Sequence, residues 1–446
     1  MTPIRFVALF IALVSLCYAH LLPRQDSAEY IISAKQGTTK ADADSFENAL
    51  RALVGEAEIN SISDEDGVPV MWRTQLKPDQ LDKVKAYRAI SSVAPNKRIP
   101  LDSIPDAEDT DPDAEPELGP APFEAATVAK RASYEQTPTW RNKLYDLRVL
   151  STPPGTKRTS PNFYYEDPAG EGITIYHIDG GLVNLAHDEF TAASGATRRI
   201  IDLDESKENT AFESKHATCS ASKIVGRTTG TAKRSNLVLI RTELTNWGLF
   251  ASLRAAAADI SKNKLQGKAV VSMSISLQVW RWDEFNEVRD QIKEISNLDV
   301  PVVCAAGNSG KKGKVVTVDS LPALVSDMVP LIVVGSASRS LKKSWFSQQG
   351  NRVTTWAVGE RVKCADYKKA TRLRTDSGTS FTAPQVAGIA AYLMSHPVHK
   401  RRFRKGTVAE DMRDVIRDSS FQRVQGNDKY PPIAWNLWNH EEAQTK

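Results

Sequence analysis

Residues 376–394 read Asp-Ser-Gly-Thr-Ser-Phe-Thr-Ala-Pro-Gln-Val-Ala-Gly-Ile-Ala-Ala-Tyr-Leu-Met. After Pro384 the stretch carries no charge and is apolar on nearly every face, which is typical of a helix buried in the centre of a domain. Ser380 falls near the start of this helix, where unpaired backbone N–H groups and the helix dipole favour negative charge. The stretch therefore predicts a central buried helix that carries a serine hydroxyl at its N-terminal end.

From about residue 165 onward, short apolar runs alternate with helical segments. The runs are rich in Val, Ile and Leu, as buried parallel strands are. They lie at 173–178, 237–240, 269–273, 300–305 and 331–334, with helical segments such as 248–260 and 285–295 between them. This order predicts an α/β fold built on a parallel sheet. In such folds the active site lies at the carboxyl ends of the strands.

Polar residues stand where two of these strands end. One strand runs into Asp179-Gly-Gly181, and another runs into Gly307-Asn308. Between them in the sequence lies His216. Singly, such residues are more typical of a turn, a packed histidine or a helix cap. Together with Ser380 they supply a nucleophile, a base, an orienting carboxylate and an amide donor, which predicts nucleophilic catalysis.

The segment Gly378-Thr-Ser-Phe-Thr-Ala-Pro384 resembles the nucleophile motif of the subtilisin-like serine proteases, the subtilases. Ile178-Asp-Gly-Gly181 is similar to the family's Asp motif, His216-Ala-Thr218 to its His motif and Ala305-Ala-Gly-Asn308 to its oxyanion segment. The Asp, His, Asn and Ser follow one another at intervals of 37, 92 and 72 residues, in the family's order. The resemblance runs from about residue 144 to Asn439. Within the family, the motifs most resemble those of the secreted fungal subtilases of the proteinase K kind.

The resemblance implies a serine endopeptidase with an α/β, subtilisin-like catalytic domain. Ser380 would attack the peptide carbonyl, His216 would accept and return its proton, and Asp179 would orient the imidazole. Asn308 would donate a hydrogen bond to the oxyanion together with the backbone N–H of Ser380. The substrate-binding positions implied in the same way are Ser274, Ile275, Ser276, Ala305, Ala306 and Gly307.

Several positions depart from the family pattern. Lys215 and Ala217 replace the glycines that flank the His, and a required positive φ at Ala217 would strain the site. Gly180 lacks the hydroxyl that usually follows the Asp. Ser276 and Leu277 replace glycines in the substrate-binding strand, so Leu277 is expected to narrow the cleft or change the side chains it accepts.

Two other functions compete with an active protease. The departures around His216 fit a catalytically impaired subtilase that acts as a binding protein. A lipase or esterase of the α/β-hydrolase fold is disfavoured, because Thr382 stands where its Gly-x-Ser-x-Gly motif needs glycine. The histidine also precedes the serine, against that fold's order. We therefore expect an active endopeptidase that acts on protein or peptide substrates.

The first residues have the pattern of an export signal. Arg5 precedes an apolar run at 6–16, and Cys17 and Ala19 are small residues suited to cleavage after Ala19. The sequence thus predicts a signal peptide at 1–19 and a secreted, extracellular protein. No other run is long enough to span a membrane. No Asn-x-Ser/Thr sequon occurs, so we expect no N-glycan.

Residues 20–101 predict a small α+β, ferredoxin-like unit similar to the propeptide inhibitor domain of the family. Residues 102–131 form an acidic, Pro-rich linker that ends in Lys130-Arg131, a processing site that would leave residues 132–446 as the peptidase domain. Residues 1–131 carry a net charge of −7 and the remainder +11, so the two parts are expected to attract one another. These features predict a zymogen whose own propeptide inhibits it; processing by the enzyme itself or by a kexin-like protease stays open.

Composition limits the remaining partners. A net charge of +4, with 41% hydrophobic and 25% charged residues, is typical of a globular protein and gives no sign of nucleic-acid binding. We expect a monomer that needs no cofactor for its chemistry. No acidic cluster has a trustworthy metal-binding spacing, so we predict no metal ligand, although the family resemblance leaves a structural calcium open.

The cysteines and His177 leave alternatives. With Cys17 in the signal, Cys219, Cys304 and Cys364 permit at most one intramolecular disulfide, and their spacing fits no zinc site. We interpret Cys219 as a buried free thiol, with a disulfide as the alternative. His177 lies on the same strand face as Asp179, and we interpret it as a packed structural histidine rather than a helper of the carboxylate.

Overall fold

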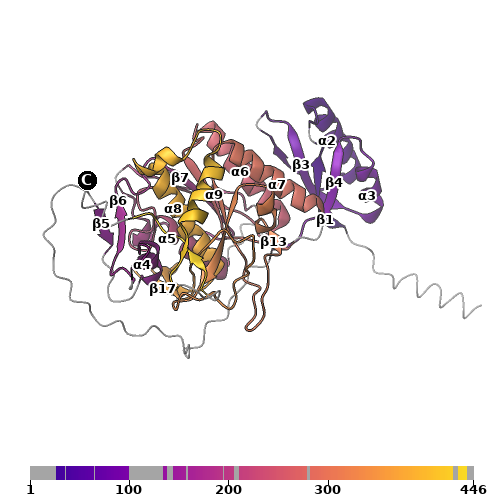
Figure 1. Cartoon of the computed structure of the whole chain (residues 1–446). Helices are drawn as coiled ribbons and strands as arrows, with labels where there is room; N and C mark the ends of the chain where they lie inside the picture. Colours follow the sequence, from indigo (N-terminus) through magenta and orange to yellow (C-terminus); the bar gives the residue numbers. More distant parts are fainter. Residues whose placement is uncertain are drawn as a thin grey trace, which may run out of the picture. The chain divides into compact units, whose positions relative to one another are not determined.

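The computed structural model describes residues 27–99, 134–137 and 144–438, except for positions 36, 65, 157–158, 194, 205–209, 279–281 and 425–429. The expected signal peptide, the acidic linker and the Lys130-Arg131 site lie outside these residues. The chain divides into two compact units, Met1–Asn96 and Lys97–Lys446. Figure 1 colours the first in indigo and the second from purple to yellow. Across the described ranges, no helix is long and apolar enough to cross a bilayer.

The first unit is an antiparallel sheet with two helices. Its elements are β1 (Ala28–Ala34), α2 (Lys40–Val54), β2 (Asn60–Ser63), β3 (Pro69–Leu76), α3 (Pro78–Lys85) and β4 (Ile90–Pro95). The strand order β2-β3-β1-β4 is the ferredoxin-like arrangement. Its core forms where Phe46 of α2 packs edge-on against Trp72 of β3, with ring centroids 4.7 Å apart.

The second unit is built on a nine-stranded sheet in the order β18-β19-β15-β14-β12-β10-β7-β9-β8. Every neighbouring pair is parallel except β18 and β19. The strands are β7 (Thr174–Asp179), β8 (Arg198–Asp202), β9 (Asn236–Arg241), β10 (Ala269–Met273), β12 (Val302–Ala305), β14 (Leu331–Ala337), β15 (Thr355–Val358), β18 (Phe421–Gln422) and β19 (Pro432–Ile433). The predicted α/β fold with a parallel sheet is therefore confirmed.

Helices pack against this sheet, and one of them lies at the centre of the unit. The helices are α4 (Tyr145–Leu150), α5 (Ala211–Val225), α6 (Asn246–Lys262), α7 (Trp282–Asn297), α8 (Thr382–Ser395) and α9 (Val408–Ser419). Helix α8 is buried along nearly its whole length and packs against β10, β12, β14 and α5, as its apolar composition predicts. Figure 1 shows α5 and α8 together in the middle of this unit, with α6 and α7 paired beside the sheet.

Three two-stranded antiparallel sheets complete the described part of the second unit. They pair β5 (Tyr134–Thr137) with β6 (Phe163–Glu166), β11 (Leu277–Gln278) with β13 (Ser320–Leu321), and β16 (Val362–Ala365) with β17 (Leu373–Asp376). The last of these pairs, a β-hairpin, packs against α5.

A disulfide joins α5 to that hairpin. Cys219 and Cys364 are bonded, with their Cα atoms 4.9 Å apart, although 145 residues separate them in the sequence. The interpretation of Cys219 as a free thiol was therefore wrong, because the packing of β16 on α5 brings a second cysteine to it. Cys304 on β12 is a buried free thiol, and its burial raises the pKa of the thiol.

Candidate active site

Three neighbouring strands bring the predicted site residues to one edge of the sheet. Asp179 ends β7, Ser274 directly follows β10, and Asn308 lies three residues beyond β12. These strands are adjacent and parallel, so their carboxyl ends meet. The sheet thus gathers at one place residues that are more than a hundred positions apart in the sequence.

Asp179 and His216 form a close pair. Nδ1 of the imidazole lies 3.0 Å from each carboxylate oxygen of Asp179. The N–H of Gly180 donates to Oδ1 of the same carboxylate at 2.8 Å. Helix α5 carries the histidine and lies very close to the end of β7, since a Cβ added at Gly181 would fall 2.2 Å from the backbone of Glu213. Only glycine allows this approach, which places the imidazole against the carboxylate.

The pair shifts the pKa of both groups. Burial alone raises the pKa of Asp179, but the charge of His216, the nearby imidazole of His177 and the hydrogen bond from His216 outweigh burial, so the pKa lies well below its usual range. Burial lowers the pKa of His216, but the charge and hydrogen bond of Asp179, helped by Asp376, raise it above its ordinary value. The carboxylate therefore stays ionised and favours a protonated imidazole.

Asn308 is held by the residue before Ser380. Its Oδ1 accepts hydrogen bonds from the backbone N–H and the hydroxyl of Thr379, at 2.9 and 2.8 Å. Both acceptor contacts therefore fall on Oδ1, which leaves the Nδ2 hydrogens for another acceptor. No sequence pattern indicates this role of Thr379, because the contact joins residues 71 positions apart.

Ser380 lies in the 3-10 turn η3 (Thr379–Phe381), just before α8. Its hydroxyl donates to the carbonyl of Ser274 at 3.3 Å, and the hydroxyl of Ser274 donates back to the carbonyl of Ser380 at 2.8 Å. The ring of Phe381 lies 5.4 Å from the ring of His216, centroid to centroid, so η3 is adjacent to the imidazole. The structure thus places the turn that carries Ser380 next to His216, and the Ser380 hydroxyl contacts the carbonyl of Ser274.

The sequence profile of the Subtilase family matches residues 110–432. This chain belongs to that family. Its similarity to Subtilisin-like protease 2 of Trichophyton rubrum is 30% identity over 267 residues, which are 58% of this chain and 59% of the relative. The Subtilisin-like protease 2 of Arthroderma otae is 32% identical over 241 residues, 53% of each chain. The chain thus spans less than two thirds of the length of these fungal relatives.

The fold is also that of a known protease structure. The crystal structure of a cold adapted subtilisin-like serine proteinase superposes with a TM-score of 0.52 at 24% identity, covering 67% of this chain and all of the other. At this level of identity the likeness shows the fold alone. The predicted resemblance to the subtilases and the subtilisin-like fold are both confirmed.

The departures from the subtilase pattern are accommodated by the local structure. Ala217 lies inside the unbroken helix α5 and is buried, so this position does not need a positive φ. The expected strain at Ala217 is therefore absent. Leu277 is buried in the antiparallel β11–β13 pair opposite Leu321, so its side chain contributes to packing there.

The other predicted substrate-binding positions flank the same site. Ser274 and Ile275 are buried, whereas Ser276 is half-buried. Ala305 and Ala306 are buried at the end of β12. Gly307 has a φ of +103°, and a Cβ there would lie 1.8 Å from Oε1 of Gln348, so the turn before Asn308 requires glycine.

The backbone of Leu244–Asn246, at the start of α6, pairs with another segment of the chain, and the sequence analysis did not predict this pairing. The N–H of Ile99 donates to the carbonyl of Leu244 at 2.6 Å, and the N–H of Asn246 donates to the carbonyl of Lys97 at 3.0 Å. Between these two bonds, Arg98 pairs antiparallel with Thr245. Leu244–Asn246 therefore binds a short extended segment in the manner of an added strand.

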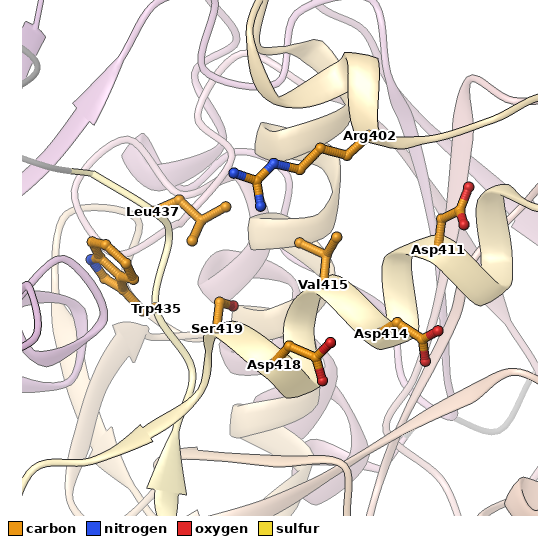
Figure 2. A pocket seen from close by; sticks show the side chains of 8 residues that line it. All are labelled: Arg402, Asp411, Asp414, Val415, Asp418, Ser419, Trp435 and Leu437. Carbon is orange, nitrogen blue, oxygen red and sulfur yellow. The ribbon is translucent and has the colours of Figure 1, made fainter.

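A separate surface pocket of about 340 Å³ lies along α9, and Figure 2 shows its lining. The lining residues are Arg402, Asp411, Asp414, Val415, Asp418, Ser419, Trp435 and Leu437. Its aspartates are paired with arginines: hydrogen bonds from Arg404 bring the pKa of Asp411 to about 2, and Arg417 lies 3.0 Å from both Asp414 and Asp418. Among the described residues, no group of three or more His, Cys, Asp or Glu side chains is placed to hold a metal ion.

Proposed function

We propose that this subtilase is a serine endopeptidase with Ser380 as nucleophile, His216 as general base and Asp179 as its orienting carboxylate. The observation that carries the proposal is the Asp179–His216 pair, with 3.0 Å contacts, next to the turn that bears Ser380. The fungal relatives to which this chain is similar carry the name subtilisin-like protease, which also supports the proposal.

The chemistry follows from these contacts. A serine hydroxyl is a weak nucleophile, so Nε2 of His216 takes its proton as the oxygen attacks the peptide carbonyl. The imidazolium that forms is stabilised by the ionised Asp179 and then protonates the leaving amine. The negative oxygen of the intermediate accepts hydrogen bonds from Nδ2 of Asn308 and the N–H of Ser380. A short rotation of the Ser380 side chain away from Ser274 begins this sequence.

The substrate is an extended peptide. The support is the Leu244–Asn246 edge, which pairs with Lys97–Ile99 through backbone hydrogen bonds that any peptide can make. The positions 274–276 and 305–307 contribute the remaining substrate contacts. Because Lys97–Ile99 holds this edge within the uncut chain, removal of the preceding segment frees the edge for substrate.

The chain is secreted and made as a zymogen. Residues 1–19 direct export, 20–101 form the propeptide domain, 102–131 the linker and 132–446 the peptidase domain. N-terminal sequencing of secreted protein tests this order: a start at Ala132 agrees with it, whereas a start upstream of Asp102 contradicts it. A Ser380→Ala variant that is still cut after Arg131 assigns the cut to another protease, of the kexin kind.

A serine-directed fluorophosphonate tests the function itself. The processed wild type is expected to take up the label and to hydrolyse a denatured protein. The Ser380→Ala variant is expected to take up no label, and its kcat should fall by a factor of about 10⁶. Ser296→Ala, which removes a buried hydroxyl on α7, serves as the matched control. Residual hydrolysis within about tenfold of wild type in Ser380→Ala rejects the assignment. If the wild type takes up no label, the result favours the second candidate function, a catalytically impaired subtilase that acts as a binding protein. The observation that favours this candidate is the contact between the Ser380 hydroxyl and the carbonyl of Ser274.

A further inference from the structure

Asp179 has a second set of partners on the side away from His216. Ser220, one turn after His216 on α5, donates its hydroxyl to Oδ2 of Asp179 at 2.8 Å. The Nε2 atom of His177 lies 2.8 Å from Oγ of Ser220 and 3.5 Å from the same Oδ2. Both His177 and Ser220 are fully buried. A charged carboxylate, a hydroxyl and an imidazole thus form one enclosed network.

The positions of the protons follow from counting donors. Ser220 has a single hydroxyl proton, for which Asp179 and the carbonyl of Ala217, at 3.1 Å, compete. The charged acceptor makes the stronger hydrogen bond, so the proton points to Asp179. The Oγ lone pairs then accept the Nε2–H of His177.

Its other ring nitrogen completes the chain. Nδ1 of His177 faces the hydroxyl of Ser272 on β10 at 3.3 Å and accepts its proton. Donors therefore point in one direction, from β10 through β7 and α5 to the carboxylate. Each bond polarises the next, which strengthens the last one to Asp179.

We propose that Ser220 and His177 are positioning residues that hold the Asp179 carboxylate toward His216 and set the basicity of that histidine. The inference rests on the proposed function, in which His216 is the general base. Oδ2 receives the hydroxyl of Ser220, Oδ1 receives the N–H of Gly180, and both face Nδ1 of His216. With a donor on each oxygen, the carboxylate plane is fixed where Nδ1 contacts both oxygens equally.

The charge on Asp179 is also divided among these donors. Loss of the Ser220 hydroxyl leaves more negative charge to act on His216, so its imidazolium becomes more stable and its pKa rises. The charged groups that face His216 are Asp179 on β7 and Asp376 and Arg374 on β17. Asp376 and Arg374 form an ion pair with each other and do not contact Ser220, so its removal leaves them unchanged.

NMR titration of His216 tests the proposal without relying on hydrolysis. The full chain carries Ser380→Ala in every sample, and the His216 signal among the seven histidines is assigned by its loss in His216→Asn. Ser220→Ala is expected to raise the pKa of His216 by about half a unit or more. Ser222→Ala is the matched control, because this buried hydroxyl on the same helix contacts Cys219 and Ala365 but not Asp179. An unchanged or lowered pKa in Ser220→Ala, or an equal shift in Ser222→Ala, overturns the proposal.

His177 provides the second arm. His177→Gln keeps an N–H donor near Ser220 and is expected to behave as wild type, whereas His177→Phe raises the His216 pKa. Combined with Ser220→Ala, His177→Phe adds no further shift, because both act through one chain of hydrogen bonds. A full additional shift in the double variant contradicts that chain.

Kinetics then separates positioning from packing. With Ser380 restored, kcat of Ser220→Ala falls about tenfold, the effect of one lost hydrogen bond, with KM unchanged. A pKa shift without any wild-type hydrolysis supports the network and rejects the protease function. Wild-type hydrolysis without the pKa shift rejects the network alone.

Discussion

Asp179 is only 3% exposed, yet its surroundings keep it charged. Burial without partners would make ionisation of a carboxylate very costly. Hydrogen bonds from Gly180, Ser220 and His216 offset this cost, and they also fix the direction in which the carboxylate faces. The acidity of one side chain thus controls the basicity of the next, His216.

The raised pKa of His216 has a consequence for the pH profile. The imidazole accepts a proton from Ser380 only when it is neutral, so activity appears as pH rises through this pKa. We expect the midpoint of the acid limb of the kcat/KM profile to lie above about pH 6.5, since the ordinary pKa of histidine is about 6.5. Measurement of kcat/KM between about pH 5 and about pH 8, the range in which proteins are generally most stable, checks this. A limb at or below the ordinary value contradicts the raised pKa.

Substitution of Thr379 tests whether its hydrogen bond to Asn308 holds the proposed oxyanion donor in place. Thr379→Val removes the hydroxyl that donates to Oδ1 of Asn308 but keeps the backbone N–H that donates there. The same hydroxyl also accepts a longer, 3.3 Å hydrogen bond from the N–H of Gly307, so two neutral hydrogen bonds are lost. We therefore expect kcat to fall about tenfold or more, with little change in KM. Asn308→Ala removes the oxyanion donor itself and should lower kcat by a factor of about 10²–10³.

Thr379→Ser is the matched control, since it retains the hydroxyl. Steady-state kinetics on one peptide substrate compares the variants. If Thr379→Ser loses as much kcat as Thr379→Val, the methyl group rather than the hydrogen bond supports Asn308.

Sequence motifs identified the residues that the structure gathers, but not the residues that hold them. Asp179, His216, Asn308 and Ser380 each lie in a short recognisable segment. Ser220 contacts Asp179 from 41 positions away, so no local pattern marks it. Such partners depend on the packing of α5 against β7, which spacing along the chain does not encode.

At the scale of elements, helix α5 is central. A capping box between Thr210 and Glu213 starts it, and the Cys219–Cys364 disulfide ties its middle to β16. The bridge lies three residues after His216. The helix that carries the proposed base is therefore anchored to the neighbouring hairpin by a covalent bond.

Removal of this bridge should lower stability rather than the chemistry. Closing a loop of 145 residues stabilises a protein by about 2–5 kcal/mol, so Cys219→Ala/Cys364→Ala should unfold at lower denaturant. Urea unfolding with and without reductant measures this. Wild type and Cys304→Ala, which keeps the bridge, should both lose stability on reduction, whereas the double variant should not respond. Reductant-independent unfolding of wild type would show that the bridge contributes nothing.

Elements were predictable where burial is complete. The strands β7, β10, β12 and β14 are continuous apolar runs because helices or other strands cover both faces, and the sequence located all four. The edge strand β8 was missed, since it begins with two arginines and is only partly buried. Helix α5 was missed as well, because its buried positions are mostly Ala, Ser, Thr and Cys rather than a regular apolar stripe.

At the scale of the whole molecule, charge is unevenly distributed. Residues 1–131 carry −7 and the remaining residues carry +11. Opposite net charges speed the encounter of two proteins, whereas buried apolar surface and hydrogen bonds determine how long the complex lasts. The released front piece should therefore meet the peptidase quickly and stay bound through contacts of the kind that Lys97–Ile99 makes with Leu244–Asn246.

We expect the separate front piece, residues 20–131, to inhibit the processed enzyme with an association rate that falls steeply with salt. Surface charges are screened beyond about 10 Å at 0.1 M salt, so the rate loses its electrostatic part while dissociation changes little. Stopped-flow inhibition at low and high ionic strength measures both rates. A front piece with Lys97→Ala and Arg98→Ala provides the control for local charge, because the acidic linker is unchanged in it and its association should remain salt-dependent. Equal association rates at the two salt concentrations would make the charge asymmetry incidental, and an absence of inhibition would remove the inhibitor role from the first unit.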